Sequence, residues 1–324
     1  MKKICLDIIE KVVKFGLNNP MIMNIPQQPY WVIDDEISLD YEFLSNIDKV
    51  EELYEDEYSK KVFQWHLYSV LLQCLYKRID LTNQMCDDPY TVKGECLDEF
   101  VSGLKKNENG EYTVNEYQIQ THKGLLKETW GARSYVLDSL FSLKEYENII
   151  DGGAYKGETT IWFANEAPNG KVHAFEIQNE VQEVLYQNIS INGLQDRVII
   201  VQKGLWDNST SQQVVLSDVT SNLGLSKGAT SQNVQTISID DYVDENQIKS
   251  VDYIKLDIEG AETKAIIGAQ KTIKKDKPVL SIAMYHKLTD IYTIPLLIKS
   301  INSEYKFYLS KKMQGNGEII LFCL

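Results

Sequence analysis

Residues 149–160 read Ile-Ile-Asp-Gly-Gly-Ala-Tyr-Lys-Gly-Glu-Thr-Thr, and this stretch decides the fold class of the chain. Two β-branched residues end in an acid, a glycine-rich turn follows, and a helical pattern then begins. Glycine suits such a turn because the backbone must bend sharply and let a ligand approach without a Cβ in the way. The order of strand, turn and helix N-terminus predicts a site for a phosphate or carboxylate group.

A second acid follows the next apolar run. Residues 171–175 read Lys-Val-His-Ala-Phe and are followed by Glu176. A carboxylate at the tip of a strand can accept two hydrogen bonds from a ribose diol, as in dinucleotide-binding folds. The two segments together predict an adenosine-bearing cofactor across two adjacent parallel strands.

The spacing of the glycines argues against a dinucleotide. The dinucleotide fingerprint is G-x-G-x-x-G, whereas Asp151, Gly153 and Gly157 give D-x-G-x-x-x-G. This spacing is associated with S-adenosylmethionine-dependent methyltransferases, whose cofactor carries an amino-acid tail where NAD carries phosphates. Glycine turns after strands are common, so other segments must support this interpretation.

Such support comes from residues 251–262, which read Val-Asp-Tyr-Ile-Lys-Leu-Asp-Ile-Glu-Gly-Ala-Glu. An apolar alternation there meets three acids around a glycine. Asp257 would lie at the carboxyl end of a central strand, where ligands of open α/β sheets bind.

At this point the chain resembles the FkbM family of methyltransferases. The matching motifs are Asp151-Gly152-Gly153-Ala154 with Gly157, Ala174-Phe175-Glu176, Asn188-Ile189 with Asn192, Ile239-Asp240-Asp241-Tyr242, Ile254-Lys255-Leu256-Asp257-Ile258-Glu259-Gly260-Ala261-Glu262, Gly268-Ala269 and Tyr285-His286-Lys287. The resemblance spans residues 130–324, and its most specific part is residues 254–262. Two positions depart from it, since Tyr155 stands where many members have Asn and Ile177 where they have Pro.

The resemblance implies an α/β fold with a seven-stranded, Rossmann-like class I methyltransferase sheet, helices on both faces, and a mainly helical N-terminal region in front. We expect residues 1–128 to form that region, which would cap the cleft, select the acceptor or mediate dimerisation. Residues 129–324 would form the S-adenosylmethionine-binding domain.

The pattern of the second half favours a parallel sheet, because strands alternate there with helical segments. The predicted strands lie near residues 148–151, 171–176, 198–202, 251–257 and 278–284. Residues 305–322 predict an antiparallel hairpin around the Gly-Asn-Gly turn at 315–317. The long stretch 204–247 predicts two strands and a loop at 221–231, which is either an acceptor-binding flap or a surface insertion.

The first half is mainly helical by pattern. Apolar residues at helical spacing predict helices over residues 1–18, 48–78 and 130–143, with shorter ones up to about residue 104. Residues 112–119 alternate well enough to predict one strand.

Bulk properties exclude several classes of function. A net charge of −14, with acids densest from Asp34 to Glu57, disfavours nucleic acid as substrate because phosphate binding needs basic clusters. The five scattered cysteines are typical of a reduced protein without disulfides or a zinc site. Neither a signal peptide nor an apolar run long enough for a membrane span is evident, so we expect a soluble, cytoplasmic protein.

The candidate cofactor residues follow from the resemblance and from the two predicted strands that end at Asp151 and Glu176. Asp151 would orient the methionine amino group or else cap the turn, and Glu176 would bind the ribose. Leu205 follows the third strand, where an adenine edge would lie. The full set is Asp151, Gly153, Ala154, Tyr155, Gly157, Glu158, Thr159, Glu176, Ile177, Leu205 and Asp257.

The candidate catalytic residues are His286, Asp257 and Glu259. A hydroxyl is a poor nucleophile, so methyl transfer to oxygen needs alignment and a base within hydrogen-bond reach. His286 follows the fifth strand, and its ordinary pKa near 6.5 suits proton abstraction. Asp257 and Glu259 are its rivals for this role.

Metal dependence is not favoured. Asp257, Glu259 and Glu262 resemble an oxygen-ligand site for magnesium. Glu262, however, falls in the first turn of the next helix, where the helix dipole favours acids anyway. We expect no metal site, although a divalent cation is compatible with these residues.

The function we expect is S-adenosylmethionine-dependent O-methylation of a saccharide, such as a cell-surface glycan, or of a polyketide-like acceptor. The alternatives are an NAD(P)-binding oxidoreductase and a non-catalytic S-adenosylmethionine-binding partner protein. The sequence names neither the acceptor nor the oligomeric state, and a homodimer is one possibility.

Overall fold

The computed structural model of this chain describes residues 46–47, 49–76, 97–216, 221–222, 230–287, 289–312 and 319–324. Its centre is a seven-stranded sheet in the order β12-β13-β11-β10-β3-β4-β5. The strands are β3 (Asn148–Gly152), β4 (Lys171–Phe175), β5 (Val198–Val201), β10 (Tyr253–Leu256), β11 (Val279–Ala283), β12 (Phe307–Ser310) and β13 (Ile320–Cys323). The five strands predicted from the alternation are therefore confirmed.

The direction of the strands fixes where a ligand can bind. β5, β4, β3, β10 and β11 are parallel to one another, and β13 pairs antiparallel with both β11 and β12. The predicted C-terminal hairpin is thus confirmed, with β13 inserted between β11 and β12. The carboxyl ends of β3, β4, β10 and β11 consequently meet at one edge of the sheet, which is where ligands of such sheets bind.

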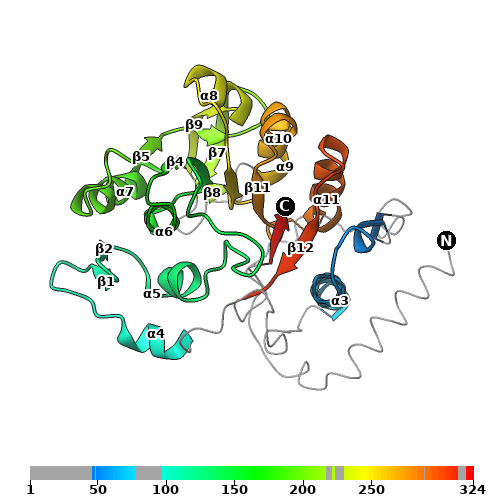
Figure 1. Cartoon of the computed structure of the whole chain (residues 1–324), viewed down its shortest axis with the longest axis horizontal. Helices are drawn as coiled ribbons and strands as arrows, with labels where there is room; N and C mark the ends of the chain where they lie inside the picture. The colour runs from blue at the N-terminus through cyan, green and yellow to red at the C-terminus, as the bar shows by residue number, and fades with distance from the viewer. Residues whose placement is uncertain are drawn as a thin grey trace.

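Helices cover both faces of this sheet (Figure 1). On one face lie α6 (Glu158–Glu166) and α7 (Asn179–Ile191), whose apolar side chains share a core with Ile149 and Val172. On the other lie α8 (Ile239–Glu245), α9 (Glu262–Ile267), α10 (Gln270–Asp276) and α11 (Asp290–Ile301), which pack with Ile150 and Leu280. Successive residues of β3 are buried on opposite faces of the sheet and so belong to two different cores, as a parallel sheet covered on both sides requires.

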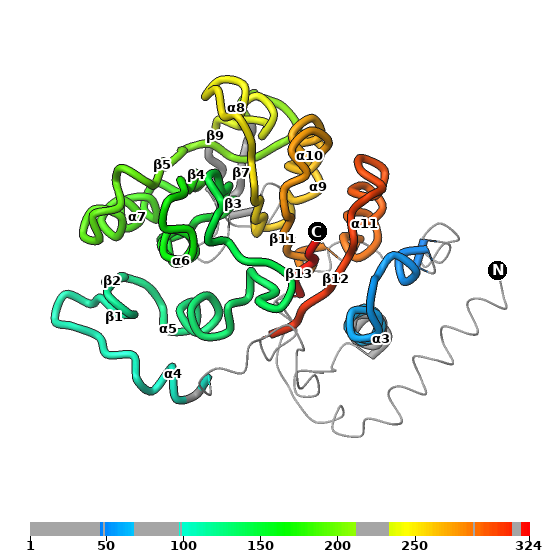
Figure 2. The backbone as a smooth tube through the Cα atoms, in the orientation of Figure 1, coloured from blue at the N-terminus to red at the C-terminus, as the bar shows by residue number. Residues whose placement is uncertain are grey.

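The described part of the N-terminal region joins both cores. α3 (Glu57–Tyr76) lies beside β12 (Figure 2), and its Phe63 belongs to the same core as Phe307. On the opposite face, α5 (Lys123–Leu126) and the π-helix η2 (Lys127–Gly131) pack toward α6. α4 (Leu97–Gly103) packs in turn on η2. The division into domains at residue 128 stays a prediction.

Two local predictions were wrong. Residues 112–119 form a two-stranded hairpin, β1 (Tyr112–Val114) and β2 (Tyr117–Ile119), because Asn115 adopts a positive φ of 53° and reverses the chain. Residues 132–143 form turns after η2 rather than a helix, and Arg133 within them has a φ of 53°. The predicted helix over residues 1–18 lies outside the described residues.

A smaller sheet follows β5, in the order β6-β9-β7-β8. It consists of β6 (Gly204–Leu205), β7 (Ser211–Leu216), β8 (Ser221–Asn222) and β9 (Thr230–Ile237), so the two strands predicted in this stretch are confirmed. Residues 217–220 and 223–229 lie outside the described residues, and the acceptor-binding flap stays a prediction. Among the helices that the structure describes, none has the length and apolar composition needed to span a bilayer.

Candidate active site

The turn after β3, residues 152–157, is the glycine turn of the candidate site. Gly153, Tyr155 and Gly157 all have positive φ, at 77°, 47° and 93°. Glycine tolerates this conformation, whereas Tyr155 is strained in it, and such strain is concentrated at functional sites. A Cβ at Gly153 would lie 1.9 Å from the backbone oxygen of Asp257, so the tips of β3 and β10 touch.

The buried side chain of Lys255, on β10, binds the glycine turn. Its side chain is 2% exposed, and Nζ lies 3.2 Å from Asp151 Oδ1. The same ammonium donates to the backbone oxygens of Gly152 at 3.0 Å and Gly153 at 2.7 Å. Burial lowers the pKa of Lys255, but the Asp151 and Asp257 carboxylates outweigh burial and leave the pKa raised. Lys255 therefore remains a buried cation.

Asp151 is enclosed by the protein. Its other oxygen accepts hydrogen bonds from the hydroxyls of Thr159 at 2.8 Å and Thr160 at 2.7 Å, and the residue is 0% exposed. Contact with a methionine amino group therefore stays a prediction, and the burial of this carboxylate disfavours it. The observed partners of Asp151 are side chains, the hydroxyls of Thr159 and Thr160 and the ammonium of Lys255, so its role as a cap of the turn backbone stays a prediction as well.

Glu176 lies at the end of β4, beside the glycine turn. Its Oε1 accepts from the backbone N–H groups of Ile177 and Gln178, and its Oε2 accepts from that of Tyr155 at 2.9 Å. Burial raises the pKa of this carboxyl, and the three N–H donors oppose that shift. A carboxylate oxygen has two lone pairs, so Oε2 can accept one further hydrogen bond, which fits a ribose hydroxyl.

The remaining predicted cofactor residues line the same edge. Leu205 lies on β6, with Cδ1 2.9 Å from the position of a Cβ on Gly152, and Ala154 is buried within the glycine turn. The Glu158 side chain is buried and accepts a hydrogen bond from Thr121, and burial raises its pKa to about 8.

Asp257 follows β10 and anchors a second group of side chains. Tyr135 donates to Oδ2 at 2.8 Å and Tyr285 donates to Oδ1 at 2.9 Å. Burial raises the pKa of this carboxyl, but Lys255, His286 and the two hydroxyls outweigh burial and lower it. Asp257 is therefore ionised, and its two oxygens face two segments of the chain, the turns after η2 and the residues after β11.

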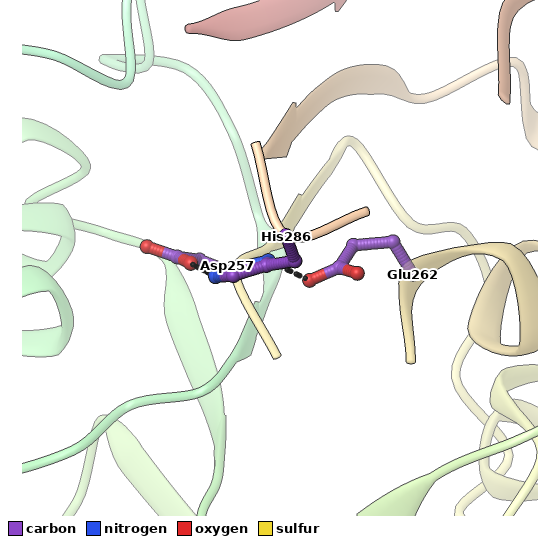
Figure 3. Close-up of side chains that lie close together, drawn as sticks. All are labelled: Asp257, Glu262 and His286. Atoms are coloured by element: carbon purple, nitrogen blue, oxygen red, sulfur yellow. Dashed lines mark hydrogen bonds and ion pairs between the residues drawn. The ribbon is translucent and has the colours of Figure 1, made fainter. Parts of the chain in front are cut away.

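His286 follows β11 and lies between acids (Figure 3). Its Nδ1 lies 2.8 Å from Glu262 Oε1, and its Nε2 lies 3.4 Å from Asp257 Oδ1 and 3.6 Å from Glu259 Oε2. We call Asp257, Glu259, Glu262 and His286 the carboxylate cluster. All three predicted catalytic residues belong to it.

The charges of the carboxylate cluster differ from those of isolated side chains. Burial lowers the pKa of His286, but the three acids outweigh burial and raise it to about 10. Burial raises the pKa of Glu259 to about 7, with His286 opposing the shift. The choice of His286 as base relied on a pKa near 6.5, and the structure does not provide that value. At neutral pH the imidazole is a cation, while Glu259 titrates near neutrality.

The cluster also has the composition of a cation site. One ligand atom each from Asp257, Glu262 and His286 lies within 4.8 Å of the others. Both imidazole nitrogens already face carboxylate oxygens, Nδ1 that of Glu262 and Nε2 that of Asp257. A metal ion bound by the imidazole would therefore have to replace a proton that lies between a nitrogen and its carboxylate. The geometry is explained by a chain of ion pairs, and metal binding stays unfavoured.

No functional role was predicted from the sequence for three residues of the site, which are Lys255, Tyr135 and Tyr285. A single charged residue in the apolar run of β10 was a usable signal for Lys255, because a buried lysine needs partners. Tyr285 is adjacent to His286. Tyr135 precedes the first strand of the sheet in the chain, and no local sequence pattern indicates its role.

Comparisons with known proteins identify a family and a similar fold. Residues 151–307 match the family model described as methyltransferase FkbM domain. The crystal structure of methyltransferase FkbM from Methylobacillus flagellatus is similar, with a TM-score of 0.56 and 17% identity over 87% of this chain. This chain covers 59% of that protein.

Two further solved structures are similar at lower TM-scores. A putative rRNA methylase from Clostridium thermocellum is 15% identical, with a TM-score of 0.38, over 56% of this chain and 89% of that one. Precorrin-6y C5,15-methyltransferase from Geobacter metallireducens is 12% identical, with a TM-score of 0.41, over 64% of this chain and 93% of that one. No curated protein matches the chain significantly.

Proposed function

Residues 151–307 belong to the FkbM family of methyltransferases, and from this premise we propose that the chain transfers a methyl group from S-adenosylmethionine to a hydroxyl. We propose a saccharide, such as a cell-surface glycan, or a polyketide-like molecule as the acceptor. The observation that carries the proposal is the convergence of Asp257, Glu259 and His286 within 3.6 Å, next to the glycine turn.

The residues around the glycine turn fit the cofactor. Glu176 retains one lone pair on Oε2 for a ribose hydroxyl, and the Tyr155 N–H orients that oxygen. Gly153 and Gly157, which suit the positive φ at these positions, place no side chain beside the start of α6, where a carboxylate is favoured. Bound there, S-adenosylmethionine would supply an electrophilic methyl group.

The carboxylate cluster supplies the groups that a hydroxyl needs in order to attack. We propose that Glu259 accepts the proton, because its pKa of about 7 lets it be a carboxylate and still a useful base at neutral pH. Its side chain is 32% exposed, so an acceptor can reach it. The His286 cation lies against both Glu259 and Asp257 and can stabilise negative charge on the acceptor oxygen.

A methyl-transfer assay with glycan and polyketide-like acceptors tests the proposal, with mass spectrometry to detect a gain of one methyl group. Glu259→Gln should lower turnover on the order of a hundredfold while cofactor affinity stays within a factor of about two. His286→Ala should have a loss of similar size, through lost charge stabilisation. The exposed residue Glu183 provides a matched control, since Glu183→Gln should change nothing.

The two variants also separate the roles within the carboxylate cluster. If Glu259→Gln retains full turnover while His286→Ala abolishes it, the base is His286, and the proposed assignment is wrong. If no hydroxyl acceptor gains a methyl group although the cofactor binds, O-methylation itself is contradicted.

A further inference from the structure

Two asparagines of the family-like motif are not explained by the proposed chemistry. Asn188 lies in the last turn of α7 and Asn192 is the residue that ends the helix, so both point along the same helix face. Asn188 is 1% exposed. Figure 2 shows that this end of α7 lies beside the β1–β2 hairpin, and β2 contacts α7 directly.

The two side-chain amides pair with the backbone that leaves this hairpin. Asn192 accepts from the N–H of Gln118 at 2.8 Å and donates to its carbonyl at 2.7 Å. Asn188 accepts from the N–H of Gln120 at 2.8 Å and donates to its carbonyl at 3.2 Å. Bonding both backbone groups of alternate residues is what a neighbouring strand does. We call Asn188 and Asn192 the asparagine latch.

The asparagine latch also reaches the glycine turn. Asn188 Nδ2 donates to the backbone oxygen of Lys156 at 2.8 Å. Next along the chain, Thr121 donates to the Glu158 carboxyl in the first turn of α6. The chain that leaves β2 is therefore fixed to residues 156–158, where the proposed cofactor would bind.

The other end of the same segment touches the carboxylate cluster. From Thr121 the chain runs through α5 and η2 to Tyr135, whose hydroxyl donates to Asp257 Oδ2 at 2.8 Å and lies 3.2 Å from Glu128 Oε1. Residues 118–135, the cap segment, therefore connect the asparagine latch, which bonds Gln118 and Gln120, to Asp257.

We propose that the asparagine latch positions Tyr135 on Asp257 by holding the cap segment against the glycine turn. This inference rests on the proposed function, because it makes Asn188 and Asn192 positioning residues for methyl transfer. Asn188 holds both the cap segment and the glycine turn, so its loss should weaken cofactor binding and turnover together. Asn192 holds only the cap segment, so its loss should lower turnover alone.

A double-mutant cycle with Tyr135→Phe tests the connection, after the parent protein is shown to be active. Asn192→Ala should lower kcat about tenfold while the Kd for S-adenosylhomocysteine changes less than about twofold. In the Tyr135→Phe background, the same change should lower kcat less than about twofold, because Tyr135 is the group that the latch positions. Equal losses in both backgrounds, or no loss in either, would overturn the inference.

Control variants separate positioning from stability. Gln187→Ala removes an exposed amide next to Asn188 and should leave kcat unchanged. Asn192→Asp keeps the oxygen that accepts from Gln118, so it should recover part of the lost turnover if Asn192→Ala folds poorly.

Hydrogen exchange gives a readout that needs no activity. Asn192→Ala should speed exchange at residues 117–121 and also at residues 133–137. Faster exchange at the first segment with unchanged protection at the second would overturn the inference. A parent protein that binds no S-adenosylhomocysteine would contradict the proposed function, while the exchange data would still decide whether the latch orders the cap segment.

Discussion

The glycine turn and the carboxylate cluster are in contact, yet different forces hold them. The glycine turn is defined by backbone shape, since positive φ values at residues 153, 155 and 157 let it pass against Asp257. The carboxylate cluster is defined by charge, since one imidazolium is shared among three acids within 3.6 Å. The difference teaches that a sequence pattern can specify the first, whereas the second depends on groups brought together by folding.

Lys255 links the two regions, and removing it should have the largest effect. Lys255→Met leaves Asp151 as a buried carboxylate without its cation, which costs roughly 3–5 kcal/mol of unfolding free energy. The double variant with Asp151→Asn should recover part of this loss, because both charges are then absent. Urea denaturation measures both values. A Lys255→Met protein as stable as the parent would mean that the ion pair is not what joins the regions.

The second largest effect is expected from a substitution that changes only the steric fit of the glycine turn. Gly153→Ala places a Cβ 1.9 Å from the Asp257 oxygen at a φ of +77°, so we expect a loss of roughly 2–4 kcal/mol. Gly193→Ala is the matched control, because its φ is +63° but nothing lies within 4 Å of the added Cβ. It should cost only about 1 kcal/mol. Equal losses in the two variants would show that contact with Asp257 does not constrain the glycine turn.

The contribution of the carboxylate cluster to the unfolding free energy should depend on pH, whereas that of the glycine turn should not. The pKa of His286 is raised to about 10, so its stabilisation is complete below pH 6.5 and is lost as the pH rises toward 10. Between pH 8 and 10 the parent should lose on the order of 2 kcal/mol of unfolding free energy relative to His286→Gln. A His286→Gln slope equal to that of the parent would contradict the raised pKa.

The sequence predicted the parts of the site that depend on local pattern. The strands that end at Gly152, Phe175 and Leu256 each carried a local pattern of apolar residues that leads to an acid, so their shared edge followed from the parallel order. The hairpin at residues 112–119 was predicted as one strand, because a reversal at Asn115 leaves the apolar alternation of its flanks intact.

The parts that escaped prediction depend on distant contacts. Tyr135 and Asp257 are joined by a hydrogen bond between segments that are far apart in the chain. No periodic pattern of the sequence predicts such a contact. The position of His286 was predicted from its strand, but its pKa was not. That pKa is set by Glu262, Asp257 and Glu259 only once the strand tips meet. Local pattern therefore located the histidine and left its charge undetermined.

Calorimetric titration of the protein with S-adenosylhomocysteine, beside NAD, tests the central claim most directly. If the glycine turn and Glu176 bind a sulfonium nucleoside, one molecule of S-adenosylhomocysteine should bind per chain, and NAD should not. Glu176→Ala should weaken that binding about tenfold, since a hydrogen bond to a charged group contributes roughly 1.5–3 kcal/mol. No binding of S-adenosylhomocysteine, or binding of NAD in its place, would contradict the account.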